Sequence, residues 1–342
     1  MRYPALSVVL LASLSACTDK SDADFRADVS VAAHTSIIED LEGLAQAARR
    51  LQRVSPTRAW DSFKDRDMIR EMQEAWKNAR IAWEHVEGAI APMFPGYNAS
   101  MDSRYEDFLP GPDSTGDRNL FDGTGVVGMH AIERILFARD IRPEIVRFEK
   151  NLTGYMPAAY PTNDGEAIAF KTQLVQRLID DTNGVITELQ QTKVELATAY
   201  GGLVSLMAEQ REKLKAATQN EEESRYANIT LFDLRNNLDG TKKVYVLFRD
   251  WILAKSAATS DRRILDRLDT LMEAYYTTNS DSLPEIPQGW SSDAPSPDSL
   301  NTPFGALWME IHRAVDPATD GSVVFEMNRI ARVLGFPAFV GD

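Results

Sequence analysis

The strongest indication of the fold class lies in residues 72–90, which read MQEAWKNARIAWEHVEGAI. Apolar side chains recur in this segment at alternating spacings of four and three residues. They are Met72, Trp76, Ala79, Trp83, Val86 and Ile90. Because an α-helix turns by about 100° per residue, this spacing places them along one side of a helix. Residues from about 57 to 91 are therefore predicted to form a helix whose apolar side packs within a bundle.

Helical periodicity continues on both sides of this segment, and alternating strand patterns are scarce. The other predicted helices cover about residues 25–53, 128–139, 144–153, 165–191, 193–217, 229–257, 260–276, 304–314 and 321–335. Two long segments rich in Pro, Gly, Ser and Asp, 92–127 and 277–303, are predicted as loops. The pattern as a whole predicts an all-α protein.

Pro157 and Pro161 mark a break in the helical pattern, which suits a domain boundary. We therefore predict two helical halves, each resembling a four-helix bundle, over residues 25–160 and 161–342. With 342 residues, 44% of them apolar, the chain can bury a sizeable core.

The net charge of −14 argues against nucleic acid as a partner, because nucleic-acid binding requires a basic surface. An acidic chain is compatible with cation binding, although many soluble proteins are acidic without it.

The N-terminus is predicted to be a targeting segment. Arg2 is followed by a short apolar stretch, Ala5 to Leu14, that is too short to span a bilayer. The stretch ends in Leu-Ser-Ala-Cys at Cys17, which resembles a bacterial lipoprotein signal; an ordinary secretory peptide is the alternative. Residues 1–16 are then the removed signal peptide, and residues 17–24 a lipidated leash that begins at Cys17.

This interpretation anchors a soluble domain to the membrane through acyl chains on Cys17, without a transmembrane helix. Cys17 is the only cysteine, so the chain has no intramolecular disulfide and no thiolate metal site. Thr18 follows it, and no aspartate is present there to favour the inner membrane. We expect a protein of the bacterial cell envelope that faces the periplasm, at the outer membrane rather than the inner one.

Two predicted helices each carry a pair of candidate metal ligands three residues apart. His130 and Glu133 form one pair, and Glu84 and Glu87 form the other. Residues at this spacing project from one side of a helix, and both pairs lie beside the apolar side. Di-metal carboxylate bundles use such inward-projecting pairs. The alternatives are an exposed Glu84 paired with Arg80 one turn earlier, and a His130 whose hydrogen bonds are purely structural.

The segment Phe121-Asp122-Gly123, followed by Gly128-x-His130-x-x-Glu133, resembles the signature of the imelysin family, which includes the EfeO/EfeM-type periplasmic iron-uptake proteins. Further segments resemble the family in its order: WEHVE (83–87), MDSR (101–104), EESRY (222–226), LFD (231–233) and NLDG (237–240). Together they cover most of the chain. Ala227-Asn228 departs from the family, because iron-uptake relatives often have Ser-His there.

The resemblance implies a metal site formed by Glu84, Glu87, Asp102, His130 and Glu133, with Glu222 or Glu223 as a further ligand. Four carboxylates and one imidazole suit Fe²⁺ or Fe³⁺, while manganese, calcium and zinc are alternatives. Such a site should lose its ion as pH falls, because the ligands must be deprotonated.

Three functions remain open at this stage. The first is a lipid-anchored periplasmic protein that binds a metal, with iron favoured, for uptake alongside an iron permease or other uptake components. The second is a metallopeptidase, as the family's classification implies, although the sequence contains neither His-Glu-x-x-His nor Gly-x-Ser-x-Gly. The third is a metal-free helical scaffold that binds partners through the loops 92–127 and 277–303.

Overall fold

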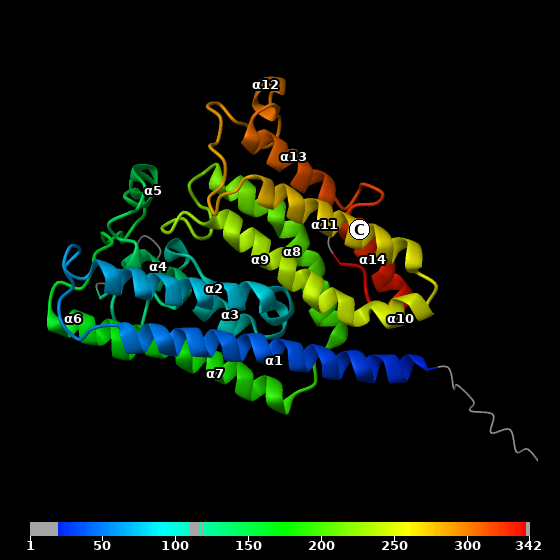
Figure 1. The fold of residues 1–342 in the computed structure, drawn as a ribbon, viewed down its shortest axis with the longest axis horizontal. Coiled ribbons are helices and arrows are strands. Elements are labelled where there is room, and N and C mark those ends of the chain that lie inside the picture. Colours follow the sequence, from blue (N-terminus) through cyan, green and yellow to red (C-terminus); the bar gives the residue numbers. More distant parts are fainter. Residues whose placement is uncertain (1–19, 110–116, 118, 340–342) are drawn as a thin grey trace, which may run out of the picture.

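The computed structural model describes residues 20–109, 117 and 119–339. Every regular element in these ranges is a helix, which confirms the all-α fold class (Figure 1). The predicted signal peptide (residues 1–16) and Cys17 lie outside the described residues. None of the described helices combines the length and apolarity that a bilayer span requires.

Two long helices form the base of the molecule. α1 (Asp22–Val54) and α2 (Arg66–Met93) lie side by side over much of their length (Figure 1). The side chains predicted to form the apolar side of α2, from Met72 to Ile90, are all buried. α1 begins inside the predicted leash because Ser21 and Asp24 form a capping box, which satisfies its first backbone amides.

The segment predicted as the first loop is partly helical, so that prediction was wrong for residues 95–102 and 105–108. Pro95 starts the short helix α3 (Pro95–Asp102), and the 3-10 turn η1 (Tyr105–Phe108) follows. Proline is well suited to the first helical position, where its missing N–H costs nothing. Next come α4 (Gly128–Leu136) and α5 (Pro143–Glu149).

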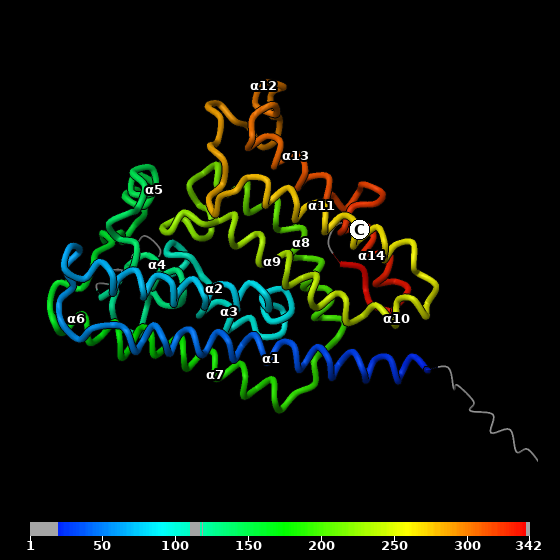
Figure 2. The backbone as a smooth tube through the Cα atoms, in the orientation of Figure 1, coloured from blue at the N-terminus to red at the C-terminus, as the bar shows by residue number. Residues whose placement is uncertain are grey.

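α6 (Asp164–Ala169), the π-turn η2 (Phe170–Leu174) and α7 (Val175–Gln191) follow one another without interruption. α7 packs against α1, although it follows the predicted boundary near residue 160 (Figure 2). By packing, α7 therefore groups with the first half of the chain, while the division into two domains stays a prediction.

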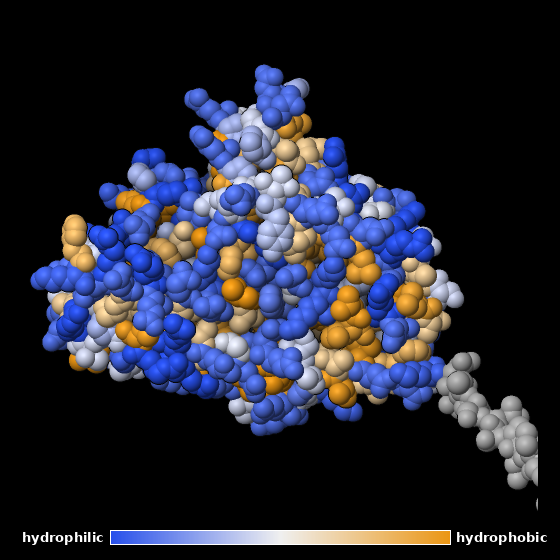
Figure 3. All heavy atoms as spheres, in the orientation of Figure 1, coloured by the Kyte–Doolittle hydropathy of each residue, from blue (hydrophilic) through white to orange (hydrophobic). Residues whose placement is uncertain are grey.

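The remaining helices form the upper part of the molecule in Figure 1. They are α8 (Leu196–Ala217), α9 (Thr230–Tyr245), the 3-10 turn η3 (Val246–Phe248), α10 (Arg249–Ala254), α11 (Ala258–Thr277), α12 (Pro297–Leu300), α13 (Pro303–Val315) and α14 (Val323–Leu334). The second predicted loop thus contains α12. α8 and α9 pack against α2, and α11, α13 and α14 lie on their other side. The face seen in Figure 3 is mostly hydrophilic, with hydrophobic residues in small patches.

Glycines bring α2 unusually close to α8 and α9. A Cβ atom added at Gly202 would lie 1.7 Å from the carbonyl oxygen of Gly88, and one at Gly240 would lie 2.4 Å from the Cα of His85. Main chain therefore meets main chain at both crossings. These contacts fix how closely α8 and α9 approach α2. The charged cluster described next is formed by side chains of these three helices and their neighbours.

Candidate metal centre

Charged and polar side chains from five helices, α2, α3, α4, α8 and α9, and from the turn between α8 and α9 meet at one junction. α2 supplies Arg80, Glu84 and Glu87, α3 ends at Asp102, and α4 supplies His130 and Glu133. Lys213 comes from α8, Asp233 and Asn237 come from α9, and Glu223 lies in the turn between these two helices.

Arg80 is the fixed centre of this cluster. Its guanidinium, fully buried, pairs with Glu84 and Asp102, lies 3.1 Å from Glu223 Oε1, and has its Nε 3.6 Å from Asp233 Oδ1. The ion pair between Arg80 and Glu84, considered in the sequence analysis as a surface alternative, is therefore present, but it lies in the interior. Arg80 could have been noticed in the sequence, because it falls four residues after Trp76 and three before Trp83, within the apolar side of α2.

His130 lies at the edge of the cluster with its two ring nitrogens in different environments. Nδ1 lies 2.8 Å from Glu133 Oε2, while Nε2 lies 3.4 Å from Asp102 Oδ1. Among the described residues Nε2 has no hydrogen-bond partner, although the ring is 1% exposed. Burial opposes protonation of the ring, yet the interactions with Asp102 and Glu133 raise the pKa of His130 to about 9.

Asp102 reaches His130 because the chain entering α4 passes directly over the end of α3. Gly128 adopts a φ of +87°, and a Cβ there would lie 2.6 Å from the carbonyl oxygens of Ser100 and Met101. Only glycine fits this approach without displacing the main chain. The Trp76 indole donates to the carbonyl oxygen of Met129 at 2.9 Å and holds α4 against α2.

Glu133 has a different set of partners from the other predicted ligands. Its Oε1 accepts hydrogen bonds from the main-chain N–H groups of Tyr226 and Ala227, both at 2.9 Å, and its Oε2 faces His130. It joins neither group of converging ligand atoms among the described residues. The two main-chain donors lie more than ninety residues away in sequence, so no local pattern predicts them.

Lys213 and Asn237 connect the remaining carboxylates. The Lys213 ammonium lies 2.7 Å from Glu223 Oε2 and 3.4 Å from Glu87 Oε2, and it donates to Asn237 Oδ1 at 2.8 Å. The Asn237 amide donates in turn to Glu84 and, at 2.8 Å, to Glu87. Sequence reasoning missed Lys213 and the role of Asn237, although the segment that contains Asn237 had been matched to the family.

The structure brings most of the predicted ligands into two overlapping groups. Oxygen and nitrogen atoms of Asp102, His130 and Glu223 lie within 4.8 Å of one another, and so do oxygens of Glu84, Glu87 and Glu223. Glu223 belongs to both groups. Glu222 instead pairs with Arg142, because successive residues of the turn point in different directions.

The comparisons with known proteins identify the family. The model of the family described as Imelysin matches residues 30–289, which is most of the chain. The chain belongs to the imelysin family.

One sequence relative and one solved structure are similar to this imelysin-family chain. It is 24% identical over 226 residues to the iron uptake system component EfeM of Pseudomonas syringae pv. syringae (strain B728a), a match that covers 66% of the chain and 65% of the relative. The chain thus spans slightly less than two thirds of that protein's length. An imelysin-like protein from Psychrobacter arcticum 273-4 has a solved structure that aligns with a TM-score of 0.61 at 11% identity, covering 95% of this chain and 99% of the other. That likeness supports the fold.

Acidic groups outnumber basic ones in this imelysin's cluster. Within the described residues, seven carboxylates surround two permanent cations, Arg80 and Lys213, and the His130 imidazole, whose raised pKa favours its protonated form. The carboxylates are Glu84, Glu87, Asp102, Glu133, Glu209, Glu223 and Asp233. This excess of negative charge favours an additional cation.

The pKa values show which carboxylates the two cations compensate. Although burial opposes it, the charge of Arg80 lowers the pKa of Asp102, and Lys213 and Arg80 lower that of Glu223. Burial, aided by repulsion from Glu223, raises the pKa of Glu87 despite the nearby lysine. Burial also raises the pKa of Asp233 to about 7. Arg80 and Lys213 thus neutralise the cluster only in part.

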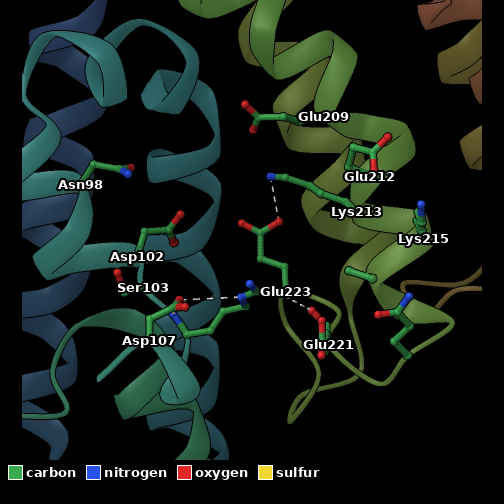
Figure 4. Close-up of a pocket in the computed structure, with 13 residues that line it drawn as sticks. Asn98, Asp102, Ser103, Asp107, Glu209, Glu212, Lys213, Lys215, Glu221 and Glu223 are labelled. Atoms are coloured by element: carbon green, nitrogen blue, oxygen red, sulfur yellow. Dashed lines mark hydrogen bonds and ion pairs between the residues drawn. The ribbon is translucent and has the colours of Figure 1, made fainter. Parts of the chain in front are cut away.

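An open pocket of about 590 Å³ leads from solvent to the cluster. Asp102, Glu209, Lys213 and Glu223 line it, and Figure 4 shows Lys213 directed toward Glu223 with Asp102 beyond. Arg104 also lines the pocket and donates to the carbonyl oxygen of Glu221 at 2.9 Å. A small ion could therefore reach the carboxylates without unfolding of either half.

Proposed function

We propose that this protein binds a metal ion, with iron the leading candidate, as an envelope component of iron uptake. One observation carries the proposal. The Nε2 atom of His130 is buried without a hydrogen-bond partner among the described residues, beside converging oxygens of Asp102 and Glu223. Nε2 lies 3.4 Å from Asp102 Oδ1 without an aligned hydrogen bond, which is costly for a buried nitrogen. Coordination of a cation would satisfy it by displacing the proton that the raised pKa of His130 favours on the ring.

The donor set fits this assignment. One imidazole with carboxylates is typical of sites for Fe²⁺, Fe³⁺ or Mn²⁺, and it also accommodates zinc or calcium. The EfeM relative is named as a component of iron uptake, which supports iron as the cargo. We place Asp102, His130 and Glu223 at the centre of the site, with Glu84 and Glu87 completing the acidic surroundings.

The location and partners complete the proposal. Lipidation at Cys17 would hold the protein at the periplasmic side of the bacterial envelope, at the outer membrane in preference to the inner one. An iron permease or another uptake component would receive the ion.

Elemental analysis of the purified protein after incubation with micromolar Fe²⁺ under nitrogen tests the proposal. We expect about one iron per chain in the wild type and none in His130→Ala. His85→Ala is the matched control, because His85 follows Glu84 on α2 but faces Asp40, 3.5 Å away. Iron-free wild-type protein, or iron retained in His130→Ala, would contradict the proposal.

A second candidate is a metal-free scaffold. The ion pairs of Arg80 and Lys213 already compensate part of the cluster's charge, and such a network could serve only to join the helices. In that case the wild type stays free of iron, manganese and zinc, and substitution of His130 changes stability alone.

A further inference from the structure

We propose that the Lys213 ammonium is a built-in counter-ion that competes with the metal ion for Glu87 and Glu223, and that Glu209 receives it when the ion binds. This inference rests on the proposed function and adds a mechanism for capture and release at the same site.

The position of Lys213 supports competition. Its Nζ lies 2.7 Å from Glu223 and 3.4 Å from Glu87, two of the three residues whose oxygens converge in the second ligand group. An ammonium at this position pairs with the same carboxylates that would bind a metal ion. Because two cations within a few ångströms repel strongly in a buried site, the ion and Lys213 oppose each other's binding.

Lys213 is the cation in this cluster that can leave. Arg80 is fully buried and contacts four carboxylates, whereas the Lys213 side chain is 12% exposed and lines the open pocket. A lysine side chain is a flexible stem with a compact charge, while the guanidinium is fixed by its planar set of hydrogen bonds. Rotation of the lysine stem toward the pocket would vacate Glu223 without moving a helix.

Glu209 lies where the displaced ammonium would go. It precedes Lys213 by four residues on α8, so the two side chains emerge on one side of the helix, and both line the pocket (Figure 4). A Glu–Lys pair at this spacing, with the glutamate on the N-terminal side, is a favourable helical ion pair. Glu209 is also more exposed than the cluster's other acids, so the displaced charge would regain water.

Isothermal titration with Mn²⁺ alone, an air-stable ion with ligand preferences close to those of Fe²⁺, tests the competition. We expect Lys213→Met to bind Mn²⁺ at least about tenfold more tightly than the wild type, since the like charge is gone. Lys215→Met is the matched control, because Lys215 lines the same pocket but contacts Asp293 at 3.5 Å instead of the cluster. Its affinity should stay within about twofold of the wild type.

A double-mutant cycle tests the role of Glu209. Glu209→Gln should weaken Mn²⁺ binding about threefold to tenfold in the wild type and clearly less in the Lys213→Met background, because no ammonium then needs a partner and only the loss of one nearby negative charge remains. An equal loss in both backgrounds would show that Glu209 acts on the ion itself and would overturn its assigned role.

The outcomes separate this inference from the proposed function. Mn²⁺ binding in the wild type that is no tighter in Lys213→Met overturns the counter-ion and leaves the metal site standing. Absence of binding in both proteins overturns the two proposals together, and binding in Lys213→Met alone supports the counter-ion. Lys213→Gln keeps a hydrogen-bond donor without the charge, so it gives the same reading if Lys213→Met fails to fold.

Discussion

Glu133 shows that a carboxylate within a metal-site motif can have a structural role, with its oxygens used in hydrogen bonds that hold the fold. Both of its oxygens have partners, and one of them satisfies two main-chain amides in the turn before α9. The same turn carries Glu223, so Glu133 fixes the position of a candidate ligand that it does not itself adjoin. Its contribution to metal binding is therefore expected to be indirect.

Removal of this side chain should destabilise the protein strongly. Glu133→Ala leaves the buried amide of Tyr226 and the partly buried amide of Ala227 without their acceptor, which we expect to lower the free energy of unfolding by about 3 kcal/mol. Glu133→Gln keeps a carbonyl oxygen for the amides and should cost only about 1 kcal/mol. Urea denaturation in EDTA measures both values without a contribution from metal. Equal and small losses for the two variants would show that the amides do not depend on this carboxylate.

This difference also decides which substitution reports on metal binding. Loss of metal in Glu133→Ala would mix unfolding with loss of a ligand. In the part of the chain that the structure describes, the polar contacts of the imidazole are with the side chains of Asp102 and Glu133, so His130→Ala leaves no main-chain group without its partner there. It is therefore the cleaner probe.

The crossing of α2 with α8 depends on two facing glycines. A methyl group at Gly202 would overlap the main chain of Gly88, so the helices would have to separate by more than a side-chain adjustment. Separation would also carry Lys213 away from Glu87, because Glu87 directly precedes Gly88 on α2 and Lys213 lies about three turns after Gly202 on α8. Helix packing and the charged cluster are thus linked through a contact without side chains.

Gly202→Ala is expected to lower the free energy of unfolding by at least about 2 kcal/mol and to weaken metal binding as well. Gly43→Ala is the matched control, because Gly43 lies inside α1 and its added Cβ would meet Ala82 at an ordinary 3.7 Å. That variant should gain up to about 1 kcal/mol, since alanine favours the helix more than glycine does. Thermal melts of both variants provide the comparison. A neutral Gly202→Ala would mean that the crossing tolerates a wider spacing.

Helix positions could be predicted from the sequence because they depend on periodic burial, which is local information. The apolar side of α2 is an example, and every residue assigned to it is buried. The helix α3 was missed because its eight residues, PGYNASMD, show little periodicity and contain residues typical of turns. Short elements are fixed by tertiary contacts, here by the approach of Gly128 to the end of α3.

The sequence indicated some of the residues that meet in the charged cluster, but not their arrangement. The i, i+3 pairs on α2 and α4 indicated that these acids and the histidine face inward. Whether Glu222 or Glu223 joins them depends on the turn between α8 and α9, whose conformation no spacing rule specifies. The compensation by Lys213 depends on a contact across 126 residues, and a solvated lysine has the same sequence signal.

At the scale of the whole molecule, the cluster joins elements from both sides of the predicted boundary near residue 160. α2, α3 and α4 precede residue 160, while Lys213, Glu223 and Asn237 follow it. Ion pairs between Arg80 and Glu223 and between Lys213 and Glu87 cross this division. An ion held by Asp102, His130 and Glu223 would add a further link, so its binding free energy would oppose separation of the two parts.

This geometry predicts that metal binding stabilises the molecule as a unit. At a free ion concentration one hundred times the dissociation constant, the folded state should gain about 2.7 kcal/mol, which raises the melting temperature by several degrees. Differential scanning calorimetry with and without Mn²⁺ checks this, with excess EDTA to reverse the shift and His130→Ala as the protein that should not respond. Because the ligands come from both sides of residue 160, every resolved transition should move together. A shift confined to one of two transitions would place the ion within a single half and would contradict the bridging site.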